Sequence, residues 1–369
     1  TYYKALEGEY GLHRLLQRAK KDSVLPEIVT VDLREEFKMK NKRIFSGRLQ
    51  EMMAETLARG EQVILFLNRR GYAGFVSCRS CGYVLKCKHC DVSMTAHTGG
   101  RLKCHYCGYE MPLPKVCPKC GSKYIAGFGT GTQKVEQMVK DIFPDAGVLR
   151  LDRDTAAGRD STEKILSDFR AHKADVLVGT QMIVKGHDFP KVTLVGILAA
   201  DLSMYSGDFM AAERTFALLV QAAGRAGRAG LPGRVVIQTY NPDHYSITCA
   251  AAQDYDAFYR QEILFRQMMH YPPAANIQAL LGECADEALL TLCMESIKRA
   301  VQNSQGRFTV PAEIMGPANA FVAKGRDVYR KVMYFKCKDL VTLLRLKRGI
   351  EAYLDKNTRF EPVYIQFDM

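Results

Sequence analysis

Four C-x-x-C pairs between residues 78 and 120 hold eight of the chain's twelve cysteines, and no other feature constrains the fold as strongly. A two-residue gap lets both thiolates of a tight turn face one tetrahedral ion at about 2.3 Å, so two pairs complete one four-thiolate zinc site. A redox dithiol is typical of one isolated pair, and a disulfide framework needs a secretory signal, which is not seen. We therefore predict two zinc ions, held by Cys78, Cys81, Cys87, Cys90, Cys104, Cys107, Cys117 and Cys120.

The pairs share the two ions in either a nested or a sequential order. The inner spacing C-x2-C-x13-C-x2-C suits a ribbon loop whose base the outer pairs close, and this favours nesting, although sequential pairing stays open. Glycines follow three of the pairs, as the sharp turn of a zinc knuckle favours. Nesting assigns Cys78, Cys81, Cys117 and Cys120 to one ion, and Cys87, Cys90, Cys104 and Cys107 to the other.

Strands and helices alternate on both sides of this segment, which indicates a parallel, doubly wound α/β sheet. The cysteine-rich segment interrupts that sheet where a strand ends. We expect strands at 63–67, 147–151, 175–178, 192–198 and 234–240, and helices from Ser46 to Gly60, Thr132 to Pro144, Asp160 to Phe169 and Met210 to Ala223.

From about Asn276 the order changes to β-α-β-β-α-β, which predicts a small split-βαβ α+β domain. Residues 271–274, YPPA, are expected to form a linker. We expect strands at 276–283, 311–316, 328–336 and 363–368 and helices at 285–302 and 338–354. The predicted domains are a sheet domain of 1–77 and 121–272, a cysteine-rich insertion of 78–120 and a C-terminal domain of 273–369.

Three polar stretches are expected at the carboxyl edge of the sheet, where ligands bind in such folds. They are 68–73, 179–189 and 221–230. In the third, Gln221, Arg225 and Arg228 recur at helical spacing among small residues, so they can grip a phosphoryl group. In the second, Thr180 and Gln181 suit a nucleic-acid backbone, and Lys185 and Asp188 suit a link to a nucleotide. The stretch GFGTGT, 127–132, opens a helix and offers backbone N–H groups to a phosphate.

Composition narrows the partners. Lys and Arg outnumber Asp and Glu by 52 to 40, a net charge of +12 that fits a polyanionic partner such as nucleic acid. No run of 18 apolar residues predicts a membrane span. The start, TYYKAL, has neither a methionine nor a targeting pattern, which predicts an internal cut or an engineered start and not a natural one.

Together, FLNRRGYAGFVSCRSCGY, the four cysteine pairs, GTGTQKVE, DVLVGTQMIVKGHDFPKVTLVG and QAAGRAGR resemble the PriA family of replication-restart helicases. The resemblance runs from Thr1 to roughly Pro273 and continues more weakly to Met369. It implies the second, RecA-like lobe of a superfamily 2 DNA helicase that moves 3′ to 5′ with ATP and Mg²⁺. It also implies nested zinc pairing and a DNA-binding C-terminal domain.

The resemblance implies a role for each motif residue. Catalytic contacts to the γ-phosphate fall to Gln221, Arg225 and Arg228, and coupling to the nucleotide falls to Gly186 and Asp188. The implied DNA contacts are Asn68, Arg69, Arg70, Thr130, Thr180, Gln181 and Lys185.

The family also implies partners: single-stranded and forked DNA, primosome proteins, the replicative helicase loader and single-strand DNA-binding protein, with a bacterial cytoplasmic, nucleoid-associated location. The sequence departs from the family because it has neither a G-x-x-x-x-G-K-[ST] loop nor a DEAH-type acidic box. We therefore expect half of an ATP site and no activity from the chain alone. A second hypothesis is a zinc-containing DNA- or partner-binding module without motor activity.

Overall fold

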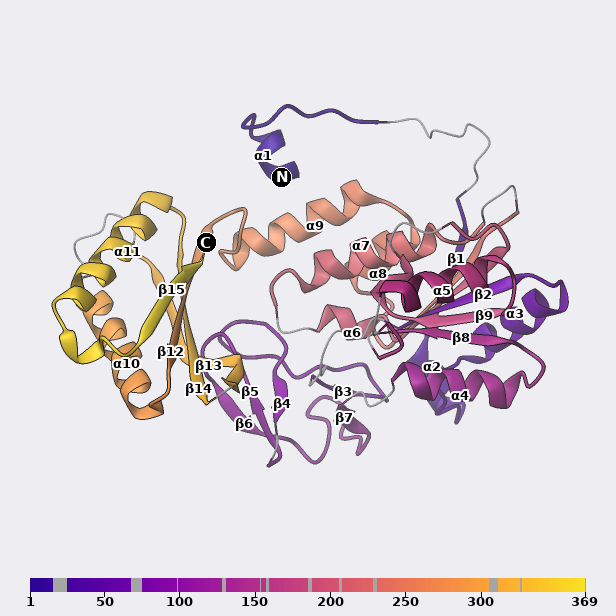
Figure 1. Cartoon of the computed structure of the whole chain (residues 1–369), viewed down its shortest axis with the longest axis horizontal. Helices are drawn as coiled ribbons and strands as arrows, with labels where there is room; N and C mark the ends of the chain where they lie inside the picture. Colours follow the sequence, from indigo (N-terminus) through magenta and orange to yellow (C-terminus); the bar gives the residue numbers. More distant parts are fainter. Residues whose placement is uncertain are drawn as a thin grey trace. The chain divides into compact units, whose positions relative to one another are not determined.

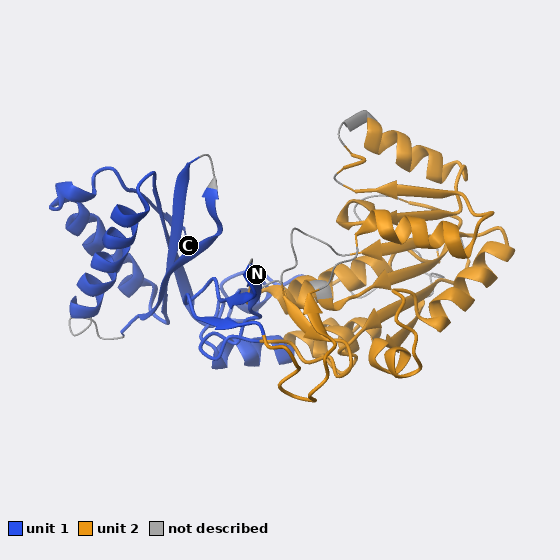
Figure 2. Ribbon diagram, turned by 90° about the horizontal axis from the view of Figure 1, so that it is seen from below, with its two compact units in different colours: residues 1–14, 86–113, 260–369 blue, residues 15–85, 114–259 orange. Residues whose placement is uncertain are grey.

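The computed structural model divides into two compact units, shown in two colours in Figure 2. One unit contains residues 15–85 and 114–259, and the other contains residues 1–14, 86–113 and 260–369. The structure describes residues 1–15, 25–67, 75–97, 99–127, 131–152, 154–156, 159–184, 188–205, 208–227, 231–304, 311–325 and 327–368.

The first unit is built on a six-stranded parallel sheet with the strand order β1-β11-β10-β2-β9-β8. The five predicted strands are confirmed, and the edge strand β1 was not predicted. The strands are β1 (Glu27–Asp32), β2 (Gln62–Leu67), β8 (Val148–Leu151), β9 (Val176–Gly179), β10 (Val192–Leu198) and β11 (Arg234–Thr239).

Helices cover both faces of this sheet because side chains of each buried strand alternate between the faces. In β2, Ile64 and Phe66 belong to the same buried cluster as residues of α5, α7 and α8, whereas Val63, Leu65 and Leu67 belong to a cluster with residues of α3 and α4. Figure 1 labels these helices around the strands. The helices are α2 (Leu33–Lys38), α3 (Gly47–Ala58), α4 (Thr132–Ile142), α5 (Arg159–Arg170), α6 (Asp201–Met204), α7 (Ala211–Ala223) and α8 (Tyr245–Ala251), with a short 3₁₀ helix η1 (Gln181–Val184).

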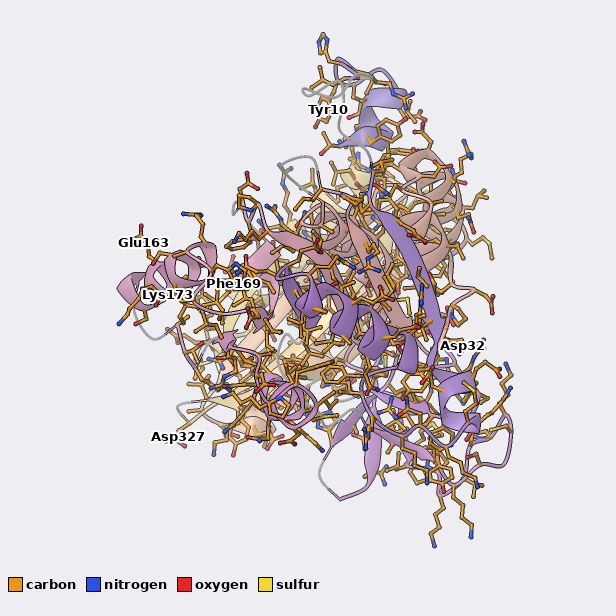
Figure 3. All side chains as sticks on the ribbon, turned by 90° about the vertical axis from the view of Figure 1, so that its right-hand side faces the viewer. Tyr10, Asp32, Glu163, Phe169, Lys173 and Asp327 are labelled. Carbon is orange, nitrogen blue, oxygen red and sulfur yellow. The ribbon has the colours of Figure 1, made fainter. Side chains whose placement is uncertain are left out.

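The amphipathic character of α5 illustrates how the helices attach. Phe169 is fully buried in the core, whereas Glu163 on the same helix and Lys173 just beyond it are exposed (Figure 3). At the start of the neighbouring strand β2, the buried Gln62 amide donates to the carbonyls of Phe169 and Ala174, both at 2.8 Å. The polar end of the helix is thereby tied to the sheet.

The cysteine-rich segment leaves the sheet after β2 and returns before α4, as predicted. Its outer part carries the two-stranded pair β3 (Val76–Cys78) and β7 (Ile125–Gly127) and belongs to the first unit. Its inner part, residues 86–113, carries β4 (Thr95–His97), β5 (Arg101–Lys103) and β6 (Glu110–Pro112) and belongs to the second unit. The boundaries predicted for a separate insertion stay a prediction.

The C-terminal residues form the predicted β-α-β-β-α-β arrangement. Four antiparallel strands in the order β13-β14-β12-β15 carry α10 and α11 on one face (Figure 1). The elements are β12 (Asn276–Cys284), α10 (Glu287–Ser304), β13 (Glu313–Gly325), β14 (Val328–Cys337), α11 (Leu340–Asp355), the 3₁₀ turn η3 (Thr358–Phe360) and β15 (Tyr364–Asp368), with α1 (Tyr2–Leu6) and α9 (Tyr255–Met268) elsewhere in the chain.

The prediction of a linker at 271–274 is wrong. Tyr271 is fully buried, and its hydroxyl donates to the carbonyl of Cys90 at 3.3 Å. Burial raises the pKa of this phenol above its ordinary value. Paired prolines suggested a linker, but the tyrosine before them supplies a large apolar ring that packs in the second unit.

We predict that Gln238→Ala lowers the free energy of unfolding by about 2–4 kcal/mol, because two buried backbone groups lose their partner. The Gln238 side chain accepts from Ser46 N–H at 2.7 Å and donates to Ile44 O at 2.8 Å, fixing the turn before α3. Chemical denaturation measures the change. Gln137→Ala, which removes an exposed amide on α4, is the control and should change stability by less than about 0.5 kcal/mol.

Candidate functional site

The eight paired cysteines gather into two four-sulfur clusters, and the nested pairing is confirmed. Within each cluster all the sulfur atoms lie within 4.8 Å of one another. The Sγ–Sγ distances are 3.7 Å for Cys78–Cys120 and for Cys81–Cys117, and 3.6 Å for Cys87–Cys107. Four thiolates about 2.3 Å from one Zn²⁺ would lie about 3.8 Å apart, so the clusters fit zinc and are far too open for disulfides.

All four pairs adopt one turn. In each, the N–H of the residue after the second cysteine donates to the carbonyl of the first, at 2.9–3.0 Å. That residue has a positive φ of 72° at Gly82, 79° at Gly108, 69° at Gly121 and 51° at Asp91. The glycine signal in the sequence therefore identified three turns, and Asp91 fills the fourth because aspartate tolerates this conformation better than most residues.

The first cluster, made by the outer pairs, is attached to the sheet of its own unit. Gly82 packs against Tyr240 just beyond β11, and its carbonyl accepts from the Asn241 amide at 3.1 Å. Among the four ligands, Cys78 and Cys117 are buried and Cys120 is exposed. The knuckle of Cys78 and Cys81 is therefore the better covered half of this site.

The second cluster, made by the inner pairs, is attached to the C-terminal strands of its own unit. The Tyr106 ring stacks on Tyr334 with centroids 4.8 Å apart. His105 Nδ1 lies 3.2 Å from the carbonyl oxygen of Asn319 in β13, and Gly108 packs against Pro317 and Ala318. These contacts all come from the turn of Cys104 and Cys107, called the second knuckle below. Zinc bound at the second cluster would therefore support this part of the C-terminal domain.

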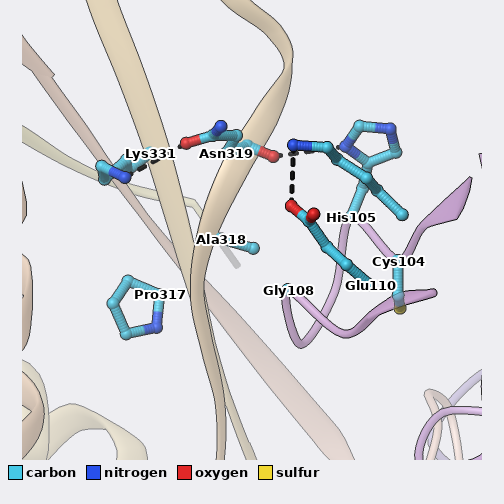
Figure 4. A pocket seen from close by; sticks show the side chains of 9 residues that line it. Cys104, His105, Gly108, Glu110, Pro317, Ala318, Asn319 and Lys331 are labelled. Carbon is cyan, nitrogen blue, oxygen red and sulfur yellow. Dashed lines mark hydrogen bonds and ion pairs between the residues drawn. The ribbon is translucent and has the colours of Figure 1, made fainter. Parts of the chain in front are cut away.

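A polar pocket of about 210 Å³ lies between the second knuckle and the β13–β14 hairpin (Figure 4). Lys331 Nζ donates to Asn319 Oδ1 at 3.1 Å, and Lys103 pairs with Glu110 at 2.7 Å. Its cations therefore already have partners. The lining residues are Lys103, Cys104, His105, Gly108, Glu110, Pro317, Ala318, Asn319 and Lys331.

Two of the predicted DNA-contact residues lie at the carboxyl edge of the parallel sheet, as expected. Thr180 follows the last residue of β9, and Gln181 begins η1; both are partly exposed. At the same edge, the hydroxyl of Thr132 at the start of α4 donates to the buried carboxylate of Asp152, which follows the neighbouring strand β8. Burial acts to raise the pKa of Asp152, but hydrogen bonds from Thr132 and the Thr155 N–H outweigh it and hold that pKa below its ordinary value.

The prediction that all three polar stretches share the carboxyl edge is wrong for the third. Gly227 N–H donates to the carbonyl of Val192, the first residue of β10, at 3.1 Å. Helix α7 runs back along the sheet after β10, so its C-terminal end and the adjoining Arg225 lie at the amino edge. Gln221 is exposed and Arg225 is partly buried. A helix that connects parallel strands must end where the next strand begins.

Asp188 also lies toward the amino edge. It precedes Val192 by a few residues, and its carbonyl accepts from Arg170 Nε at the end of α5, at 3.4 Å. Thr180 and Asp188 therefore lie at opposite edges of the sheet. The remaining predicted site residues, Asn68, Arg69, Arg70, Thr130, Lys185, Gly186 and Arg228, lie outside the described residues.

Sequence reasoning missed Asp201. This aspartate begins α6, separated from the end of β10 by two residues, is 4% exposed, and accepts hydrogen bonds from Thr239, Tyr240 and Asn241. Burial raises its pKa above the ordinary value, while those hydrogen bonds act in the opposite direction. An acidic residue soon after a buried strand was the available signal.

Family models match two regions of the chain, the cysteine-rich segment and the parallel-sheet domain. A family model for the PriA DNA helicase Cys-rich region matches residues 87–112, and a helicase conserved C-terminal domain model matches residues 125–230. The replication restart protein PriA of Bacillus subtilis strain 168 is 44% identical over 370 residues, covering 100% of this chain and 46% of that protein. The chain belongs to the PriA family.

Other PriA proteins agree. Those of Synechocystis and Chlamydia muridarum are 41% and 38% identical, covering 90% and 93% of this chain and 41% and 46% of their own lengths. The chain thus spans less than half the length of these relatives. Yeast Dbp5 bound to RNA and ADP BeF3 is a distant structural neighbour, with 13% identity and a TM-score of 0.34 over 73% of this chain and 51% of that chain.

Among the described residues, no helix has the length and apolar character needed to cross a membrane. The helicase C-terminal match includes η1, which begins at Gln181, and α7, which contains Gln221. The two family models thus match the cysteine-rich region and the parallel-sheet region of the same chain.

We predict that Cys104→Ser lowers the zinc content from about two ions per chain to about one and loosens the C-terminal domain, because the second knuckle folds around its metal. Metal analysis and limited proteolysis around Tyr271 and Tyr334 measure both effects. Cys117→Ser, which disables the first cluster, should lose one zinc but leave cleavage near those tyrosines unchanged. Equal cleavage in the two variants would contradict the assignment.

Proposed function

We propose that the chain supplies the second RecA-like lobe, the zinc region and the C-terminal domain of an ATP-dependent 3′–5′ DNA helicase that acts in replication restart and primosome assembly at stalled forks. The observation that carries this proposal is the PriA match over the full chain, with the helicase C-terminal match at residues 125–230. The net charge of +12 supports a nucleic-acid substrate.

In this proposal the amino edge of the sheet faces the nucleotide. Gln221, Arg225 and Arg228 contact the γ-phosphate, and arginines there stabilise the charge that develops during phosphoryl transfer. Two observations support this. The end of α7 and Asp188 both lie by the first residues of β10, and the small residues around Arg225 leave room for a second surface to approach.

The carboxyl edge carries the DNA track. Thr180 and Gln181 offer hydrogen bonds to a phosphate backbone, and Asn68, Arg69, Arg70, Thr130 and Lys185 are proposed to join them. Strand β10 has seven residues, so the two edges lie about 20 Å apart. Thr180 and Asp188 lie at these two edges, and we propose that the residues between them in the sequence, which include Gly186, couple DNA to the nucleotide.

The proposed ligands are ATP with Mg²⁺, two structural Zn²⁺, and single-stranded or forked DNA. The proposed protein partners are primosome proteins, the replicative helicase loader and single-strand DNA-binding protein, in the bacterial cytoplasm at the nucleoid. A zinc-containing binding module without motor activity is the competing function. The two functions differ in a measurable property, because a binding module needs no nucleotide and hydrolyses no ATP.

The test is Arg225→Ala in the full-length protein that carries this chain. Removing the arginine should lower DNA-stimulated ATP hydrolysis by about 10³–10⁵-fold and leave DNA affinity nearly unchanged, because the guanidinium acts on the γ-phosphate. Steady-state hydrolysis and fluorescence anisotropy measure the two quantities. Arg48→Ala removes an exposed arginine paired with Glu51 on α3 and is the matched control. Unchanged hydrolysis in Arg225→Ala would contradict the proposal.

The isolated 369-residue chain should hydrolyse no ATP, whatever DNA is added, since its sequence has no G-x-x-x-x-G-K-[ST] loop and no DEAH-type acidic box. In the proposal those groups belong to the complementary half of the ATP site. DNA-stimulated hydrolysis by the isolated chain would show that the chain holds a whole site. If the isolated chain binds DNA and Arg225→Ala does not change ATP hydrolysis by the full-length protein, the binding module would be favoured.

A further inference from the structure

Asp201 joins the ends of two neighbouring strands through both of its carboxylate oxygens. Its Oδ1 accepts from Thr239 Oγ1 at 2.9 Å and from Asn241 Nδ2 at 3.2 Å, and its Oδ2 accepts from Tyr240 N–H at 2.9 Å. Asp201 follows β10, and the three donors end or follow β11. The carboxylate therefore organises the backbone of Tyr240 and Asn241.

The first zinc knuckle rests on that backbone. Asn241 Nδ2 donates to Gly82 O at 3.1 Å as well as to Asp201. A Cβ atom on Gly82 would lie 2.2 Å from Tyr240 O, so the two backbones touch directly. The Arg79 guanidinium lies 5.0 Å from the centre of the Tyr240 ring. Tyr240 and Asn241, whose backbone Asp201 organises, thus hold the turn that carries Cys78 and Cys81.

We propose that Asp201 is a positioning residue that clamps the first zinc knuckle onto the carboxyl edge of the sheet and thereby slows the loss of its zinc ion. Cys120, on the other knuckle of this site, is exposed, so a competing ligand reaches the metal from that side. Complete release also requires the Cys78–Cys81 knuckle to open, and the contacts with Tyr240 and Asn241 resist that opening.

The same clamp bears on the DNA track if the proposed function is right. Residues 68–74 connect Leu67, at the end of β2, to Phe75, and both flanking side chains are buried. Phe75 leads into β3, which ends at Cys78. Clamping the knuckle therefore fixes one end of the connection that carries Asn68, Arg69 and Arg70. The experiment below needs neither ATP nor DNA, so its outcome is independent of the proposed function.

The first variant is Asp201→Asn in the full-length protein. Both carboxylate oxygens accept hydrogen bonds, so an amide must place its NH₂ group against a donor or force Asn241 to turn away from Gly82. After addition of a zinc chelator, alkylation of Cys78, Cys81, Cys117 and Cys120, followed by mass spectrometry, should be about tenfold faster or more than in the wild type. The four cysteines of the second site should react at the wild-type rate.

Asp152→Asn is the matched control, because Asp152 is also a buried carboxylate at the carboxyl edge and none of its hydrogen bonds reaches a knuckle. It should leave both zinc sites at wild-type rates. Wild-type alkylation of the first site in a folded Asp201→Asn protein overturns the proposal. Equal acceleration by Asp152→Asn also overturns it, since the effect would then come from general loosening of the sheet edge.

A pair of glycines tests the clamp even if Asp201→Asn does not fold. Gly82 and Gly121 occupy the same position in the two knuckles of the first site, with φ of 72° and 69°, so alanine strains both turns alike. The added methyl meets Tyr240 at Gly82, whereas no described residue lies within 4 Å of a Cβ at Gly121. Gly82→Ala should speed alkylation of the first site about tenfold beyond Gly121→Ala. Equal rates in the two variants overturn the proposal.

Discussion

Burial of the parallel sheet on both faces is the constraint on which the first unit depends. Each strand must place apolar side chains alternately toward two helical layers, as β2 does with Ile64 and Leu65. Every strand then runs in one direction, and every connecting helix returns in the other. The sheet therefore has a carboxyl edge and an amino edge. Polar residues just beyond a strand lie at the carboxyl edge, and those just beyond a connecting helix lie at the amino edge.

The division into edges gives meaning to the order of motifs along the chain. Thr180 follows β9 at one edge, and Asp188 precedes β10 by four residues at the other. Arg225 joins Asp188 at the second edge because α7 has brought the chain back. Thr180 and Asp188 thus lie at opposite edges of the sheet although only seven residues separate them in the chain.

The cysteine clusters organise a segment that has little apolar core of its own. Two knuckles of the first cluster and two of the second have one turn geometry, yet their surroundings differ. Gly82 packs on Tyr240 in one unit, whereas Tyr106 stacks on Tyr334 in the other. Metal ions held by the clusters would fold the knuckles, and contacts beyond the cysteines decide which part of the protein each knuckle supports.

The sequence by itself determined the nested grouping of the eight paired cysteines, the alternation of strands and helices, and the β-α-β-β-α-β domain, because each follows from local spacing or periodicity. Only the tertiary structure decided that Arg225 lies at the amino edge, that Tyr271 is core and not linker, and that Asp201 contacts the end of β11. These features depend on contacts between residues far apart in the chain, and no local pattern records which distant backbone a buried side chain will meet.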